Sequence, residues 1–160
     1  MGLPASATQN ISEDDMELLR YAAAVLMAGL PLIALLQLVR VLPEDARVVK
    51  TIGDEVMIVG NDPAALVDWA VGFQQLHRAR PRPRIGIHYG EVLYRDGDYY
   101  GREVNQAARV SARAAGGEVL VTQPIVDASE LHLEFEFIGE VRLKGFAEAT
   151  ELYVARQTPD

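Results

Sequence analysis

Apolar and polar positions along the chain alternate in blocks, and the spacing within each block predicts a strand or a helix. Two β-branched runs, residues 46–51 and 55–60, flank Gly53 and Asp54, a pattern that predicts a β-hairpin with these two residues at its tip. After Pro63 the apolar residues recur at helical spacing. Those expected on one helix face are Leu66, Trp69, Ala70, Phe73 and Leu76. Residues 46–76 are therefore predicted to form a β-hairpin followed by an amphipathic helix.

The rest of the chain continues this alternation and contains no internal repeat. The elements predicted there are strands over 84–89 and 91–95, a turn at 96–98, a helix over 102–115, a short strand at 118–121, a short helix near 124–129, and strands over 132–142 and 149–155. Strands and helices in this mixed order predict an α+β fold.

The region before residue 43 has a different character. No charged residue occurs from Tyr21 to Val39, a length near the lower limit for a membrane-spanning helix. Local signals favour two soluble helices instead, because Ser12 begins a capping-box pattern, Gly29 suits a helix end and Pro31 suits the first turn of a new helix. Membrane association is therefore not expected.

We accordingly predict helices over 13–28 and 31–41, joined by a sharp Gly-Leu-Pro corner. Such a helical hairpin has a large apolar surface, which must be buried against another part of the molecule.

Composition narrows the range of possible functions. A chain of 160 residues makes one ordinary domain, and its formal net charge of −8 argues against binding to nucleic acid or anionic lipid. The absence of cysteine excludes disulfides and thiolate chemistry. The N-terminus carries no secretory signal, so a cytoplasmic location is expected.

Several common chemistries lack their sequence signatures. The chain has no phosphate-binding loop of the Walker type and no glycine-rich dinucleotide motif. His77, His88 and His132 lack the spacing of metal ligands and are interpreted as surface or packing residues. The arginine-rich run over 78–84 is interpreted as a solvated helix exit.

Five polar residues remain at suggestive offsets. Lys50 and Asp54 flank the hairpin tip, Asp98 precedes a predicted helix, and Asn105 and Arg109 lie four apart on that helix, hence on one face. Each alone is an ordinary turn or surface residue. Together they suit a nucleotide: lysine and aspartate can read the donor and acceptor edge of adenine, arginine can neutralise phosphate charge, and an aspartate can bind a divalent cation.

Five segments within residues 46–155 resemble class III nucleotidyl cyclases in their order and spacing. They are KTIGDEVM (50–57), IGIHYGEV (85–92), GDYYGREVNQAARV (97–110), GGEVLVT (116–122) and LKGFAEATELYV (143–154). The resemblance implies a ferredoxin-like cyclase sheet with flanking helices.

The resemblance also implies a role for each of the five residues. Lys50 and Asp98 would select adenine, so ATP is favoured over GTP, Asn105 would position the ribose, and Arg109 would stabilise charge on the α-phosphate. Asp54 would bind one of two Mg²⁺ or Mn²⁺ ions that assist closure of ATP to 3′,5′-cyclic AMP and pyrophosphate. Active sites of this family form between two chains, which implies a homodimer, or a heterodimer with another cyclase chain.

The sequence departs from the family pattern in two places. The family opens with a strand that bears Phe-x-Asp-x-x-Gly-Phe-Thr and supplies the first metal aspartate, and no such string precedes Asp54; Asp14 and Asp15 lie in a different context. A basic phosphate-binding residue of the family is replaced by Phe146, with Lys144 as a candidate substitute.

Residues 13–41 are similar to the helical regulatory region of some actinobacterial soluble adenylyl cyclases. This similarity predicts that residues 1–43 are a helical regulatory remnant and that residues 44–160 are a partial catalytic domain without its first central strand. Three functions stay open: an adenylyl cyclase with an impaired metal site, a noncatalytic subunit that pairs with a complete cyclase chain, and a degenerate fragment that binds nothing specific.

Overall fold

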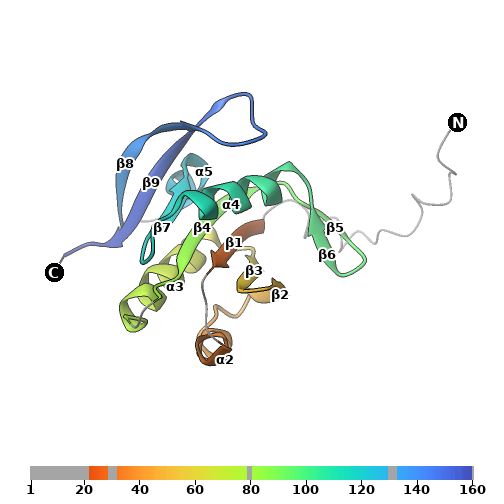
Figure 1. Ribbon diagram of the computed structural model, residues 1–160, viewed down its shortest axis with the longest axis vertical. Coiled ribbons are helices and arrows are strands. Elements are labelled where there is room, and N and C mark those ends of the chain that lie inside the picture. The colour runs from red at the N-terminus through yellow and green to blue at the C-terminus, as the bar shows by residue number, and fades with distance from the viewer. Residues whose placement is uncertain (1–21, 29–31, 79–80, 130–132, 160) are drawn as a thin grey trace, which may run out of the picture.

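The computed structural model of the chain describes residues 22–28, 32–78, 81–129 and 133–159. The elements in chain order are β1 (Ala22–Ala28), α2 (Leu32–Arg40), β2 (Arg47–Ile52), β3 (Glu55–Gly60), α3 (Pro63–Leu76), β4 (Arg84–Gly90), β5 (Leu93–Arg95), β6 (Asp98–Tyr100), α4 (Arg102–Arg113), β7 (Val119–Thr122), α5 (Gln123–Ala128), β8 (Leu133–Arg142) and β9 (Ala149–Gln157). A seven-stranded mixed sheet has the order β2-β3-β1-β4-β7-β9-β8, and β5 pairs with β6 in a separate hairpin (Figure 1). The α+β prediction is confirmed.

The segment over 22–28 corrects the prediction of an N-terminal helix over 13–28. It forms strand β1, which lies between β3 and β4 and pairs antiparallel with both, so that Val25 is opposite Ile58 on one side and Ile87 on the other. The sheet therefore has a strand in the central position that the sequence interpretation left empty, and the predicted helical hairpin is wrong over these residues. The part of that helix before residue 22 lies outside the described residues.

The physical reason is that hydrogen bonding within the sheet contributes more free energy than the helix propensity of these residues. Alanine favours a helix by only a fraction of a kcal/mol per residue, about 0.7 at most over ordinary residues. Without β1, the facing edges of β3 and β4 would leave buried N–H and C=O groups unpaired, at a cost of about 1–3 kcal/mol for each group. Pairing on both edges therefore decides the conformation of this alanine-rich run.

The second predicted N-terminal helix is confirmed as α2. Its Leu38 is fully buried in the same apolar cluster as Val25 of β1, so the described part of this region is built into the core of the sheet. Within the described residues, no helix is both long and apolar enough to span a membrane.

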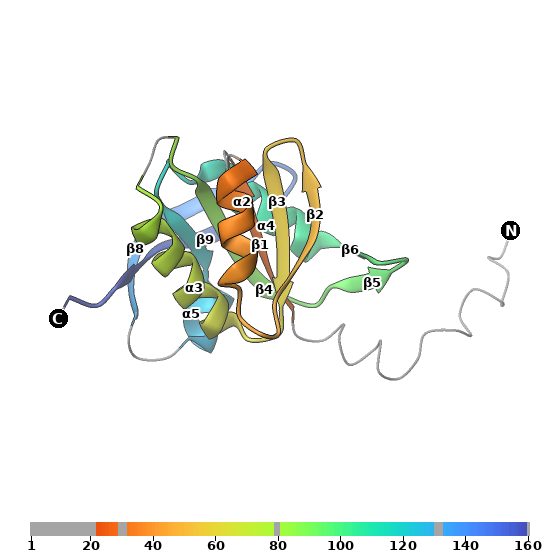
Figure 2. The same cartoon turned by 90° about the horizontal axis from the view of Figure 1, so that it is seen from below.

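Alternation along the strands gives the sheet two different faces. In β3, Val56 and Ile58 are buried in the cluster under α2, α3 and α5, whereas Met57 and Val59 are buried in the cluster that includes Ala107 of α4. Figure 2 shows α2, α3 and α5 on one side of the sheet with α4 behind it. The face under α4 positions the candidate site.

Helix α4 lies against β4 at van der Waals distance because β4 has glycine at the contact points. A Cβ atom at Gly86 would lie 2.2 Å from the backbone nitrogen of Ser111, and one at Gly90 would lie 2.6 Å from a carboxylate oxygen of Glu103. A larger residue at Gly86 would push α4 away from the sheet, and one at Gly90 would displace the Glu103 side chain.

The two hairpin turns have the backbone angles that their residues favour. Gly53 has φ 60° at the β2–β3 tip, and Asp96 and Gly97 have φ 52° and 80° at the β5–β6 tip. The first turn confirms the predicted hairpin. At the second turn, Asp98 was predicted to belong to the turn but is the first residue of β6, four positions before α4 begins at Arg102.

Candidate functional site

Lys50 and Asp98, which are 48 residues apart in sequence, meet in the structure. Lys50 projects from edge strand β2, and its Nζ donates to Oδ2 of Asp98 at 2.7 Å. The other carboxylate oxygen of Asp98 accepts the backbone N–H of Tyr99, also at 2.7 Å. The two side chains keep 36% and 23% of their surface exposed, so a ligand can still reach the pair.

The ion pair sets the charge state of this edge of the site. The hydrogen bond from Lys50 holds the pKa of the Asp98 carboxyl below its ordinary value, partial burial opposes this, and the Tyr99 N–H acts in the same direction as Lys50. Asp98 is therefore ionised at neutral pH and can only accept hydrogen bonds, while the ammonium beside it can only donate. The site thus presents one acceptor next to one donor.

Residues on strand β2 and the β5–β6 hairpin hold this pair in place. Arg47 donates to the Tyr99 hydroxyl at 2.6 Å, and its guanidinium lies 5.4 Å from the ring centroids of both Tyr94 and Tyr99. These cation–π contacts fasten the hairpin to the sheet beside Lys50.

Asn105 and Arg109 are both exposed on α4 and line one pocket, as their spacing predicts. The opposite wall is the β8–β9 loop, which contributes Lys144 and Phe146, and the cavity volume is about 720 Å³. The structure thereby brings Lys144 into the neighbourhood of Arg109, 35 positions earlier in the chain. Two cations beside an amide make this pocket suitable for phosphate oxygens.

Sequence reasoning missed Arg102 in this region. Arg102 lines the same pocket, and its guanidinium lies 5.3 Å from the centroid of the Phe146 ring. The sequence could have indicated this role, because Arg102 directly follows Gly101 and lies in the first turn of the helix that carries Asn105 and Arg109.

Asp54 has a different environment. It is exposed in the β2–β3 turn, and no group of three or more His, Asp or Glu side chains among the described residues could hold a metal ion. Strand β1 carries no acidic residue, and the three residues that follow it in the sequence are Gly29, Leu30 and Pro31. The donors in the described part of this chain therefore do not fit a two-ion site. Asp14 and Asp15 lie outside the described residues.

His88 belongs to a buried polar network, which agrees with its interpretation as a packing residue. Its Nδ1 lies 2.6 Å from the Thr122 hydroxyl, and its Nε2 hydrogen-bonds to a carboxylate oxygen of Glu103 on α4. Burial lowers the pKa of His88, and the hydrogen bond to Glu103 opposes this effect. The network ties α4 to β4 and β7. His77 stacks on Phe73 at the end of α3, and His132 lies outside the described residues.

Comparison with protein families identifies the class to which these features belong. Residues 37–157 match the model of the adenylate and guanylate cyclase catalytic domain. The match covers well over half of the chain, so the chain belongs to this family. Proteins of this class III family bind nucleotide substrates, use divalent metal ions and work as dimers.

Curated relatives are considerably longer than the matched region. The chain is 36% identical over 117 residues to a pH-sensitive adenylate cyclase of Mycobacterium tuberculosis. The aligned region covers 68% of this chain and 30% of that protein. It is 37% identical over 95 residues to an adenylate cyclase of Glutamicibacter nicotianae, covering 58% of this chain and 23% of that protein. The chain thus spans less than a third of the length of these relatives.

Solved structures share the fold. An adenylate/guanylate cyclase/hydrolase from Silicibacter pomeroyi superposes with a TM-score of 0.69 at 24% identity, over 88% of this chain and 98% of that chain. The guanylate cyclase domain of a rhodopsin-guanylyl cyclase from Catenaria anguillulae, in complex with GTP, gives 0.74 at 14% identity, over 88% and 98%. Nearly the whole of each cyclase structure therefore has a counterpart here, in agreement with the presence of β1.

Proposed function

We propose that this chain is an adenylyl-cyclase-type domain that recognises ATP and, by itself, has little or no turnover. The observation that carries the proposal is the Lys50–Asp98 pair, a donor beside an acceptor at 2.7 Å. Adenine presents an amino donor next to a ring-nitrogen acceptor on its base-pairing edge, and guanine presents the reverse order. An ionised Asp98 matches the adenine amino group, and Lys50 matches the ring nitrogen.

The pocket beside α4 supports the remaining roles. Asn105 would hold the ribose, and Arg109 would stabilise charge on the α-phosphate as the ribose 3′ oxygen bonds to phosphorus and pyrophosphate leaves. Lys144 lines the same pocket and would take the place of the basic residue that Phe146 replaces. Because ATP is the proposed ligand, we expect the protein in the cytoplasm.

The metal half of the site explains the low expected turnover. Mg²⁺ and Mn²⁺ require several oxygen ligands, and Asp54 is a single carboxylate in an exposed turn. One aspartate together with the triphosphate would bind the ions weakly. A homodimer of this chain would repeat the deficiency at both of its sites.

The second candidate is a noncatalytic subunit that pairs with a complete cyclase chain. It is favoured by β1, which completes the sheet between β3 and β4 but carries no acidic residue. A heterodimer would combine Lys50, Asp98, Asn105 and Arg109 of this chain with both metal carboxylates of the other. The exposure of Asn105 and Arg109 leaves them accessible to such a partner.

Complementation separates these candidates. Cyclic AMP formation would be measured with Mn²⁺ and ATP for the purified chain and for its Asp54→Ala variant. Each would also be measured in a mixture with a second cyclase chain. That second chain keeps both metal aspartates, but its own adenine-selecting lysine is replaced by alanine. Product from the chain alone that disappears in Asp54→Ala identifies an enzyme. Product only in the mixtures identifies a noncatalytic subunit. No product in any sample, together with no ATP binding, would leave only the degenerate fragment.

A further inference from the structure

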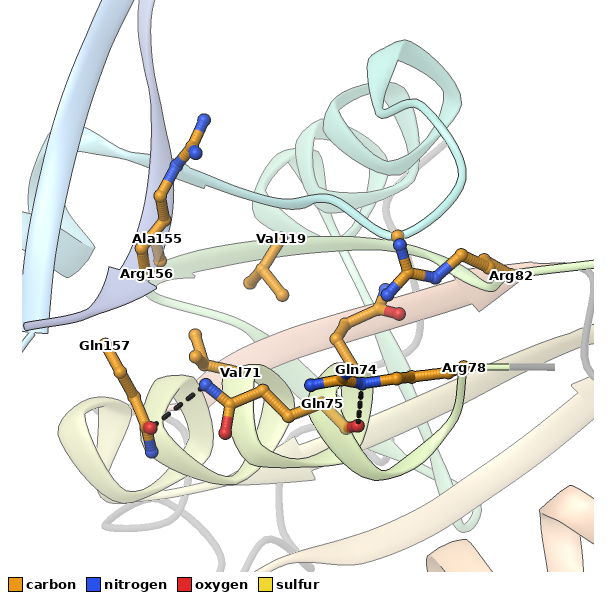
Figure 3. Close-up of a pocket in the computed structure, with 10 residues that line it drawn as sticks. Val71, Gln74, Gln75, Arg78, Arg82, Val119, Ala155, Arg156 and Gln157 are labelled. Atoms are coloured by element: carbon orange, nitrogen blue, oxygen red, sulfur yellow. Dashed lines mark hydrogen bonds between the residues drawn. The ribbon is translucent and has the colours of Figure 1, made fainter. Parts of the chain in front are cut away.

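A second pocket lies on the opposite face of the sheet and carries charge opposite to that of the whole chain. It is enclosed by the end of α3, the segment before β4, the start of β7 and the end of β9 (Figure 3). Its lining residues are Val71, Gln74, Gln75, Arg78, Arg82, Gly117, Val119, Ala155, Arg156 and Gln157. Three are arginines and none is acidic, although the chain has a formal net charge of −8. Two of these arginines belong to the run over 78–84 that was interpreted as a solvated helix exit.

Arg82 is held in position by its surroundings. Gly117 has φ 90°, a backbone conformation that favours glycine, and the Arg82 guanidinium packs closely against it, since a Cβ atom there would lie 3.0 Å from Nη1 of Arg82. The Gly117 N–H donates to the carbonyl of Pro83 at 2.9 Å. Gln74, which is 5% exposed, donates to the same carbonyl at 2.7 Å and to that of Glu118 at 3.3 Å. The backbone that carries Arg82 is therefore fixed before any ligand binds.

Arg78 enters the pocket from the same end as Arg82 (Figure 3). Its Nε donates to the carbonyl of Gln75 at 3.2 Å, which orients the side chain and leaves its terminal nitrogens available. Among the described residues, neither Arg78 nor Arg82 forms an ion pair with a carboxylate, whereas Arg156 pairs with Glu136 at 2.9 Å. Two unneutralised guanidinium groups at one pocket repel each other, and an anion between them would remove that cost.

The remaining lining residues indicate which anion would fit. Guanidinium groups match the oxygens of phosphate in a bidentate fashion. Val71, Val119 and Ala155 add apolar surface, and Gln75 donates to Gln157 at 2.9 Å on the far side. The cavity volume of about 480 Å³ is suitable for a small molecule. We propose that this pocket binds a phosphate group, either free phosphate or a small phosphate monoester, through Arg78 and Arg82.

The proposed phosphate site is separate from the nucleotide site. It shares no lining residue with the pocket of Asn105, Arg109 and Lys144, and it lies on the α3 side of the sheet whereas that pocket lies beside α4. It therefore stands whether or not the chain recognises ATP.

Titration calorimetry of the full chain with inorganic phosphate and with phenyl phosphate tests the proposal. We expect saturable binding of at least one of them, weakened about tenfold or more in Arg82→Gln and in Arg78→Gln, because each loses a charge-assisted hydrogen bond. Arg95→Gln is the matched control, since Arg95 is 71% exposed on the β5–β6 hairpin, and it should bind as the wild type does. In Arg109→Gln the component of binding that Arg82→Gln and Arg78→Gln remove should remain, because Arg109 lines only the pocket beside α4.

Tighter binding of phenyl phosphate would identify a monoester site that uses the apolar wall, and equal binding would identify a site for free phosphate. The proposal is overturned if neither ligand binds at millimolar concentration, or if the Arg82 and Arg78 variants bind as Arg95→Gln does. A loss confined to Arg109→Gln would also overturn it, because the phosphate would then occupy the nucleotide pocket. Thermal unfolding of each variant confirms that the fold is retained.

Discussion

Lys50 and Asp54 lie four residues apart in one hairpin, but their surroundings differ. Lys50 is paired with Asp98, whose second oxygen is held by a backbone N–H, and Arg47 fastens the neighbouring tyrosines. Asp54 lies in an exposed turn, and the described part of the chain offers it no cluster of acidic or histidine neighbours. One part of the hairpin is therefore built into a polar site, and the other part is not.

In the function proposed above, base recognition and metal binding depend on different parts of the fold. A donor–acceptor pair needs two side chains, and β2 and β6 supply both. A metal site needs several oxygen ligands, and β1, the strand next to β3, consists only of apolar residues. The sheet depends on the backbone of β1 and on buried apolar side chains such as Val25, so the strand can persist without an acidic residue.

Arg109→Ala, in the pocket beside α4, should have the largest effect on activity. This chain would be mixed with the cyclase whose adenine-selecting lysine is replaced by alanine. We expect the rate of cyclic AMP formation in that mixture to fall about 10²–10³-fold, because a group that stabilises transition-state charge is lost. Arg109 is exposed, so the unfolding temperature should change little. Arg113→Ala, one turn further along α4 and also exposed, is the control. An equal loss in both variants would show that general charge, not Arg109 itself, matters.

Lys50→Glu should have the next largest effect. It places a second carboxylate beside Asp98, removes the donor to adenine and raises the pKa of Asp98 by removing its strongest partner. We expect ATP affinity to fall about tenfold or more, measured by calorimetry. Lys144→Gln should also weaken ATP binding but should leave the ratio of ATP to GTP affinity unchanged. Unchanged ATP affinity in Lys50→Glu would contradict the adenine assignment.

His88→Gln tests the support under α4. The loss of buried hydrogen bonds to Thr122 and Glu103 should lower the free energy of unfolding by about 1–3 kcal/mol at neutral pH, measured by urea denaturation.

The same substitution should also change the dependence of stability on pH. Because burial lowers the pKa of His88 from 6.5, the unfolded chain binds this proton more readily than the folded chain does. Wild-type stability should therefore decrease as pH falls below 6.5, and this part of the decrease should be absent in His88→Gln. Thr122→Val, which keeps the imidazole, should retain it. Identical pH profiles for wild type and His88→Gln would contradict this account.

The smallest effect is expected for Asp54→Ala. In a mixed assembly whose partner supplies both metal aspartates, cyclic AMP formation should be unchanged, and the free energy of unfolding should stay within about 0.5 kcal/mol of the wild type because the residue is exposed. A substantial loss of activity in the mixture would mean that Asp54 itself takes part in metal binding, and would favour the homodimeric enzyme.

The local sequence pattern was sufficient to predict most of the helices and strands. The hairpin around Gly53, the helix after Pro63 and the helix that carries Asn105 and Arg109 all form where periodicity and turn residues predict them. The spacing of Asn105 and Arg109 also placed them correctly on one helix face, because a helical face depends only on residues three or four apart.

Three features were decided only by the tertiary structure. The alanine-rich run over 22–28 is a strand because β3 and β4 both need a partner, a condition set by residues 29 to 68 positions away. Lys50 meets Asp98 because the β5–β6 hairpin lies beside β2, and Lys144 joins the pocket of Arg109 because the β8–β9 loop lies beside α4. Arg78 and Arg82 line a common pocket, in which Gly117 and Gln74 both hold the carbonyl of Pro83, the residue after Arg82. The sequence pattern carries information about residues that are close together along the chain. These contacts depend instead on the order in which the sheet arranges strands that are distant in sequence.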